Sequence, residues 1–210
     1  MNEVQTATGD SKLSPQTAKA TAGPSAADLA LQDSLLPGVS RTFALTIPQL
    51  PEPLRVPVTN AYLLCRIADT IEDEPTLSPE DKQAYHDQFV DAVNGKTSAT
   101  EFARSLYPRL SAATLPAERE LILHAQQVLH TTRALPKRQR EALQRCVSIM
   151  CDGMTEFQNN EGREGLEDLR EMERYCYFVA GVVGEMLTEL FCDYSTDIES
   201  SRKELMDLAV

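Results

Sequence analysis

The stretch "YLLCRIADTIEDEP", residues 62–75, has the apolar content of a buried helix but carries several charges. At about 100° per residue, four polar side chains fall within an arc of roughly 60°, and Glu72 lies at its edge. These four are Tyr62, Arg66, Asp69 and Asp73. We call the five residues the polar stripe. The rest of the helix surface is apolar or small, so the helix is expected to pack on most sides and to turn the stripe toward an internal cavity.

Two simpler explanations fit the same residues. An acidic run such as "DTIEDE" (69–74) is typical of a solvated helix end. Arg66 and Asp69, spaced i, i+3, can also form an ordinary helix ion pair worth about 0.2–0.5 kcal/mol. Both explanations stay open when the stripe is considered alone.

Composition limits the class of protein. The chain has 210 residues, 42% hydrophobic and 25% charged, which is enough for one domain with its own core. The net charge of −12 argues against nucleic-acid binding, which needs clustered Lys and Arg. Five cysteines without C-x-x-C spacing indicate free thiols in a cytoplasmic protein.

Neither a secretory signal nor a transmembrane segment is expected. The N-terminus lacks a basic segment followed by an apolar core. The most apolar stretch, "YCYFVAGVVGEMLTELF" (175–191), contains Glu185 and Glu189 and is shorter than the ~20 residues that a bilayer crossing needs.

The chain divides into a tail and one helical domain. Residues 1–27 are small and polar and are expected to be a disordered N-terminal tail. In residues 28–210 apolar residues recur at helical spacing and no stretch alternates like a strand, which predicts an all-α fold. The expected helices lie near 40–47, 54–74, 79–93, 99–112, 117–132, 137–159 and 166–191, with a last one from about 196. Clusters such as "LLPGVS" (35–40) are expected to interrupt them.

The stretch "PGVSRTFALTIP" (37–48) predicts an anion site. Ser40 occupies an expected N-cap position, and Arg41 follows in the first turn. Unpaired N–H groups at a helix start and a guanidinium both favour phosphate. The alternative is an ordinary capped helix with Arg41 in solvent.

Two glycines interrupt the apolar stretch 175–191. Gly181 and Gly184 stand in mid-helix, where each costs about 1 kcal/mol relative to Ala. With Tyr177 and Thr188 they form a strip without bulk, along which either a neighbouring helix or a long apolar ligand passes. Tyr175 stands on another side, where a phenol is usually a core residue with a hydrogen-bonded hydroxyl.

An acidic protein that holds an anionic ligand needs a cation between the two. Mg²⁺ prefers oxygen ligands and is commonly held by one or two carboxylates together with substrate phosphates. Asp69 and Asp73, one turn apart on one face, can offer such oxygens.

Together, three motifs resemble the squalene/phytoene synthase family of head-to-head prenyl synthases. "VSRTFALTIPQLP" (39–51) is similar to the family's S-R-[ST]-F segment, and "YLLCRIADTIED" (62–73) to its first aspartate-rich motif. "YCYFVAGVVGEMLTELF" is similar to its Y-C-x-x-V-A-G-x-V-G helix. The resemblance covers about residues 33–197 and implies a class I isoprenoid synthase helical bundle around a central cavity, of which this chain is expected to be the N-terminal portion.

The resemblance also implies roles for individual residues. The expected metal ligands are Asp69, Glu72 and Asp73. The expected contacts to substrate are Ser40, Arg41, Phe43, Tyr62, Arg66, Val179, Gly181 and Gly184, with the arginines and Ser40 on the diphosphate. Tyr175 is expected to be catalytic beside Asp69 and Asp73, by assisting proton removal or steadying a carbocation.

The implied reaction joins two farnesyl diphosphates into presqualene diphosphate with Mg²⁺, followed by reduction to squalene with NADPH. The lipophilic product implies a cytoplasmic enzyme with peripheral membrane association. The family's second aspartate-rich motif is not recognised, since Asp193 and Asp197 lack its surroundings. Three alternatives therefore stay open: a phytoene or dehydrosqualene synthase, another class I terpenoid enzyme, and a non-catalytic helical scaffold that binds prenyl diphosphates.

Overall fold

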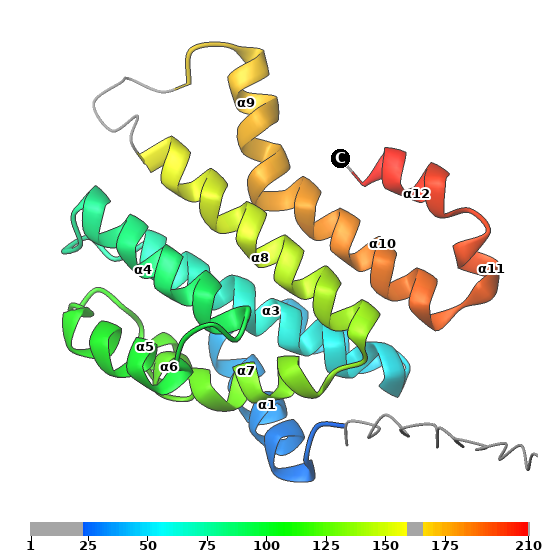
Figure 1. The fold of residues 1–210 in the computed structure, drawn as a ribbon, viewed down its shortest axis with the longest axis horizontal. Helices are drawn as coiled ribbons and strands as arrows, with labels where there is room; N and C mark the ends of the chain where they lie inside the picture. The colour runs from blue at the N-terminus through cyan, green and yellow to red at the C-terminus, as the bar shows by residue number, and fades with distance from the viewer. Residues whose placement is uncertain (1–22, 159–165, 210) are drawn as a thin grey trace, which may run out of the picture.

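The computed structural model describes residues 23–158 and 166–209, and within these ranges every regular element is a helix (Figure 1). The α-helices are α1 (Ala26–Val39), α2 (Phe43–Thr46), α3 (Glu52–Glu72), α4 (Pro79–Val93), α5 (Ala99–Leu106), α6 (Pro116–Leu123), α7 (Ala125–Ala134), α8 (Lys137–Gln158), α9 (Leu169–Cys176), α10 (Val182–Tyr194), α11 (Thr196–Glu199) and α12 (Arg202–Leu208). Two 3₁₀ turns, η1 (Ile47–Gln49) and η2 (Tyr107–Arg109), and a π-helical turn, η3 (Tyr177–Gly181), join them. The all-α prediction is confirmed.

Serine caps explain where several helices begin. The hydroxyls of Ser25, Ser78 and Ser98 accept hydrogen bonds from the N–H groups three residues later, at the starts of α1, α4 and α5. Pro79 follows Ser78 at the first helical position, where its missing N–H costs nothing. These local signals are why the predicted bounds of α4 agree with the structure.

The expected break at 35–40 is wrong, because α1 continues through Pro37 and Gly38 to Val39. Proline forfeits the intrahelical bond of its own N–H, and Pro37 lies only two residues before the end of α1, so little helix follows the disturbance. The N–H of Ser40 donates to the carbonyl of Leu36 at 3.0 Å and closes the last turn. Helix α1 also begins at Ala26, two positions before the expected start of the domain, while residues 1–22 of the predicted tail lie outside the described residues.

Helix α3 is the centre of the bundle. It packs against α1, α4, α6, α7, α8 and α10, and Figure 1 shows it behind α4 and α8. Leu63, Leu64, Ile67 and Ile71 of α3 are fully buried. Helix α8 lies beside α3, α4 and α10 and buries Leu143, among other residues. Burial of α3 on nearly every side confirms the prediction made from its sequence.

A buried polar network joins three helices around Asn60. Its side-chain N–H group donates to Gln32 Oε1 of α1 at 2.8 Å and to the carbonyl of Val128 of α7 at 2.9 Å. The Thr132 hydroxyl donates to Asn60 Oδ1 at 2.7 Å. Both the NH₂ group and the carbonyl oxygen of the buried Asn60 amide therefore have hydrogen-bond partners, and leaving either unpaired would be costly.

The last described helix, α12, is attached differently from the core helices. It has no buried residue and lies along α10 (Figure 1). Arg202 forms an ion pair with Glu189 of α10. A Cβ on Gly184 of α10 would lie 2.6 Å from the carbonyl oxygen of Ala209, so the chain just after α12 approaches the α10 backbone where glycine permits it.

One described helical stretch, Leu169–Tyr194, is 26 residues long and contains an 18-residue window with a mean hydropathy of 1.3, so by length and composition alone it could cross a membrane. The expectation of no transmembrane segment rested on the 17-residue motif, and η3 makes the helix longer by joining α9 to α10. Glu185 and Glu189 of this stretch pair with Arg145 and Arg138 of α8, which favours a helix of the bundle.

Candidate active site

The polar stripe lies along the second half of α3 as predicted. Between Ala61 and Glu72 all residues are buried except Cys65 and four members of the stripe, which are partly exposed. Asp73 is exposed and caps the C-terminus of α3. The stripe is therefore a narrow, partly exposed strip on a half of α3 that is otherwise almost entirely buried.

Arg66 is the cation of the stripe and touches two carboxylates. Its NH1 lies 3.5 Å from Asp69 Oδ2, and its NH2 pairs closely with Glu118 Oε1 of α6. The Nε–H is buried and has no hydrogen-bond partner among the described residues. The guanidinium is thus bound to a carboxylate on each of two sides while its Nε–H has no partner among the described residues.

Two acidic groups of the stripe, Asp69 and Glu72, resist ionisation. Burial raises the pKa of Asp69 to about 6, an effect that the charge of Arg66 reduces and that of Asp73 increases. Burial, together with the charges of Asp69 and Asp73, raises the pKa of Glu72 to about 7, while Lys82 of α4 acts in the opposite direction. Three carboxylates with too little neutralising charge form a site that favours a cation.

The donor set fits Mg²⁺ in one respect and falls short in another. Carboxylate oxygens that lie close enough to repel one another are suitable ligands for this ion. Among residues 23–158 and 166–209, however, no group of three or more His, Cys, Asp or Glu side chains is arranged to hold a metal by itself. A site that uses one or two of these carboxylates and completes its ligands from a phosphate is consistent with both observations.

The segment before α2 is held against the N-terminal end of the stripe by Tyr62. The Tyr62 hydroxyl donates to the carbonyl of Val39 at 3.1 Å, and its ring lies 5.2 Å from that of Phe43. Phe43 is 52% exposed, and Arg41 is exposed as well. The structure therefore brings the S-R-T-F segment and the stripe together.

The predicted helix start at Ser40 is wrong in detail. Ser40 is the C-cap of α1, and α2 begins at Phe43 and has four residues. The Ser40 hydroxyl still accepts the N–H of Phe43 at 3.0 Å. So short a helix has little dipole, and its first N–H, that of Phe43, is already bonded to Ser40, so an anion site here would depend on Arg41 instead.

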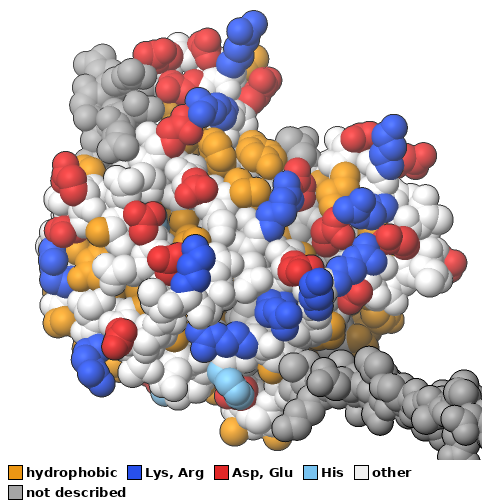
Figure 2. Space-filling model, in the orientation of Figure 1, with side chains coloured by type: hydrophobic (Ala, Val, Ile, Leu, Met, Phe, Trp, Pro, Cys, Tyr) orange, Lys and Arg blue, Asp and Glu red, His pale blue; other side chains and the backbone are white. Residues whose placement is uncertain are grey.

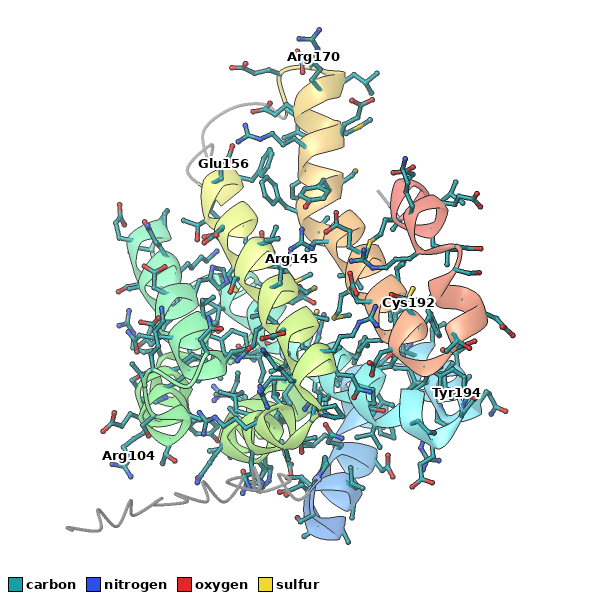
Figure 3. The ribbon with its side chains drawn as sticks, turned by 45° about the vertical axis from the view of Figure 1, so that its right-hand side comes forward. Arg104, Arg145, Glu156, Arg170, Cys192 and Tyr194 are labelled. Carbon is teal, nitrogen blue, oxygen red and sulfur yellow. The ribbon has the colours of Figure 1, made fainter. Side chains whose placement is uncertain are left out.

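Tyr175 lies near the stripe although it is over 100 positions away in the chain. Its ring stands edge-on to Phe157 of α8 at 5.2 Å. Burial raises the pKa of Tyr175, and the negative charges of Glu72, Asp69 and Asp73 raise it further, so the phenol and the carboxylates share one region. Figure 3 shows the C-terminal end of α8, with Glu156, beside α9, which carries Tyr175.

The π-helical turn η3 changes the predicted channel wall. Val179 is partly exposed and Gly181 is buried, both within this turn. A π turn accommodates more residues than an α turn, so the projection that placed Tyr177 on one face with Gly184 and Thr188 does not hold across it. A Cβ on Gly184 would lie 2.6 Å from the carbonyl oxygen of Ala209, so close packing with the chain after α12 accounts for a glycine at this position. The place of Gly184 in a channel wall stays a prediction.

Sequence analysis missed two residues that shape this region of the molecule, Gly153 and Glu118. A Cβ on Gly153 of α8 would lie 2.2 Å from Phe178 Cγ, so this glycine makes room for an aromatic ring of η3. Glu118 follows "ATLP" (113–116) in the chain and looks like an ordinary first-turn acid. Neither had a signal, since each depends on a partner at least 25 positions away.

A groove of about 520 Å³ lies between α8, α10 and α12, away from the stripe. Arginines and glutamates form its rim, and Figure 2 shows basic and acidic side chains interspersed where these helices meet. Arg145 pairs with Glu185 across it at 2.6 Å, and Figure 3 shows Arg145 on the side of α8 that faces α10. None of Asp69, Glu72, Asp73 or Tyr175 lines this groove.

The helical bundle and the stripe define an all-α protein with the isoprenoid synthase fold, and comparison with known proteins agrees. The squalene/phytoene synthase family matches residues 36–210. The chain belongs to this family.

Similar relatives are fungal and algal squalene synthases. A squalene synthase of Gibberella zeae is 33% identical over 156 residues, which are 73% of this chain and 31% of the relative. One of Cochliobolus lunatus is 30% identical over 154 residues, 73% of this chain and 35% of the relative. A Botryococcus braunii squalene synthase is 28% identical over 181 residues, which are 86% of this chain and 36% of the relative.

A solved squalene synthase, TcSQS in complex with the ligand BPH1237, superposes with a TM-score of 0.67 at 28% identity. The match covers 80% of this chain and 45% of that one. The chain spans about a third of the length of the curated relatives described above.

Proposed function

We propose that this protein joins two farnesyl diphosphate molecules head to head into presqualene diphosphate and reduces that product to squalene with NADPH. The observation that carries the proposal is the stripe of Arg66, Asp69 and Glu72 on α3, whose carboxylates lie near enough to Tyr175 of α9 to raise its pKa, in a chain of this family. Ionisation of an allylic diphosphate requires metal ligands and a hydrogen-bond donor to the diphosphate. The coupling that follows requires a group that assists the loss of a proton.

One or two of the carboxylates of Asp69, Glu72 and Asp73 would hold Mg²⁺ against the diphosphate, whose oxygens would complete the ligands of the ion. When bound, the ion supplies positive charge that assists the departure of the diphosphate. Arg66 would donate its unpaired Nε–H to a diphosphate oxygen, and Arg41 with Ser40 would contact the same group from the segment before α2.

The remaining candidates would shape the prenyl site. Phe43 and Tyr62 present adjoining aromatic surfaces at one end of the stripe. Val179 and Gly181 of η3 would line the other side, next to Tyr175. The Tyr175 hydroxyl, which its raised pKa keeps protonated at neutral pH, would steady the carbocation of the first coupling step, or assist proton removal by passing its own proton to a diphosphate oxygen as it accepts one.

The decisive experiment supplies labelled farnesyl diphosphate to the full-length enzyme with and without Mg²⁺ and NADPH and identifies the product. Presqualene diphosphate without NADPH and squalene with it are expected. Dehydrosqualene, or a C40 product when geranylgeranyl diphosphate is supplied, would support the corresponding relatives in the family. A head-to-tail product would indicate another class I enzyme, and Mg²⁺-dependent binding without any product would indicate a scaffold.

The same proposal places the protein in the cytoplasm with peripheral membrane association, because squalene partitions into lipid. Cell fractionation tests this. Recovery in the membrane fraction after a carbonate wash would instead indicate an inserted segment, for which Leu169–Tyr194 is the candidate.

A further inference from the structure

Arg66 is shared unequally between two carboxylates on different helices. It pairs closely with Glu118 of α6, whereas its contact with Asp69 on its own helix is a long 3.5 Å. Asp69 is three positions further along α3, a spacing at which Arg and Asp side chains meet readily without a third group. Something therefore keeps the guanidinium from closing fully on Asp69.

Glu118 is fixed well enough to do this. Its side chain is only 10% exposed, and its second oxygen, Oε2, accepts the N–H of Leu115 at 3.1 Å. That bond is part of the N-terminal cap of α6, so the carboxylate has little freedom to follow Arg66. The pair also links α6 to α3, which are in contact.

The position of Arg66 matters for any cation bound by Asp69. A guanidinium that made a close two-bond contact with Asp69 would occupy the oxygens that a metal needs. Held by Glu118, the guanidinium remains near Asp69 but approaches only its Oδ2, at the long distance of 3.5 Å. The buried Nε–H has no hydrogen-bond partner in the described part of the chain.

We propose that Glu118 is a positioning residue: it anchors Arg66 from α6 and thereby keeps Asp69 free to bind a divalent cation. The inference deepens the proposed magnesium site and rests on it. It assigns Glu118 no contact with substrate or metal. Its effect on the metal passes through Arg66.

The test measures binding of Mn²⁺, an oxygen-seeking ion that replaces Mg²⁺ and whose free fraction is counted by paramagnetic resonance. The Asp69→Asn variant of the whole chain defines which part of the binding belongs to the site. Glu118→Gln keeps the bond to Leu115 but loses the charge, and Glu118→Asp keeps the charge but is one methylene too short. Both are expected to weaken site binding about five- to tenfold.

The matched control is Glu120→Gln, an exposed acid on the same helix, which should change site binding by less than twofold. In an Arg66→Gln background, which retains a hydrogen-bonding partner for Glu118, Glu118→Gln should have no further effect. The unfolding midpoint of each variant is recorded so that a fold defect is recognised.

The outcomes separate the two claims. Normal binding by Glu118→Asp with weak binding by Glu118→Gln would show that only the nearby charge matters, and would overturn the positioning role. The positioning role would also be overturned if Glu118→Gln weakened Mn²⁺ binding to the site by the same factor in the wild type and in the Arg66→Gln background. Equal binding by wild type and Asp69→Asn would overturn the proposed metal site itself, and the inference with it.

Discussion

Replacing Asp69 by Asn should make the metal-free protein more stable at neutral and alkaline pH. The folded state raises the pKa of Asp69 from 3.8 to about 6, so the folded protein binds this proton more tightly than the unfolded chain does. Stability from this group is therefore highest below about pH 4 and falls as the pH rises to about 6. Asparagine resembles the protonated acid and avoids that loss.

The size of the effect follows from the pKa and the exposure. At about 1.36 kcal/mol per pH unit, a rise from 3.8 to about 6 corresponds to about 3 kcal/mol as an upper limit. The side chain is 35% exposed, so solvent screening reduces this, and we expect about 1–2 kcal/mol at pH 8. At pH 4 the two proteins should differ by less than about 0.5 kcal/mol.

Urea unfolding followed by circular dichroism, in EDTA at pH 4 and pH 8, measures this difference. Asp33→Asn, an exposed acid on α1, is the control and should stay within about 0.5 kcal/mol of wild type at both pH values. Added Mg²⁺ should stabilise the wild type but not Asp69→Asn. An Asn variant that is less stable than wild type at pH 8 would show that the ion pair with Arg66 outweighs burial, and the reasoning would fail.

Three further predictions concern other parts of the molecule. Glu74→Gln should destabilise the fold by about 2–3 kcal/mol at pH 7, and by progressively less as the pH falls from 4.5 to 2. Burial opposes ionisation of Glu74, but hydrogen bonds from Thr114, Ser111 and Thr76 outweigh it and lower the pKa of this carboxyl to about 2. Thermal unfolding against pH measures this, and a pH-independent loss would contradict it. Tyr175→Phe keeps the ring against Phe157 but should slow presqualene diphosphate formation by the full-length enzyme at least ~100-fold with unchanged stability; Tyr194→Phe is the control, and equal rates would leave Tyr175 a packing residue. Gly153→Ala should cost about 1–2 kcal/mol despite the better helix propensity of Ala, since Phe178 must move, and Phe178→Leu in the same chain should recover most of the loss in chemical denaturation.

Features that depend on near neighbours could be predicted from the sequence. The stripe on α3 is a matter of spacing along one helix, and Ser78 with Pro79 fixes the start of α4 within two residues. Helix type and the burial of α3 follow from the same short-range pattern.

Features that depend on distant partners could not. Proline ends many helices, but α1 continues past Pro37, and its last turn is closed by the bond from the Ser40 N–H to the Leu36 carbonyl. The expected helix near 117–132 divides at His124 into α6 and α7, and no glycine or proline marks that point. The widened turn η3 accompanies the contact of Phe178 with Gly153, and Glu118 acquires its importance only when α6 meets α3.

The attachment of α12 implies that ionic strength acts unevenly on this molecule. Glu189 of α10 pairs with both Arg138 of α8 and Arg202 of α12, and Arg138 also reaches Glu199 at 2.7 Å. Both arginines are more than 40% exposed. The Debye length falls from about 8 Å at physiological salt to about 3 Å at 1 M, which is close to the length of these pairs, so molar salt weakens them. The apolar contacts of α3 with α8 do not weaken in this way. Raising the salt concentration should therefore loosen α12, and open the groove beneath it, well before the bundle itself loses stability.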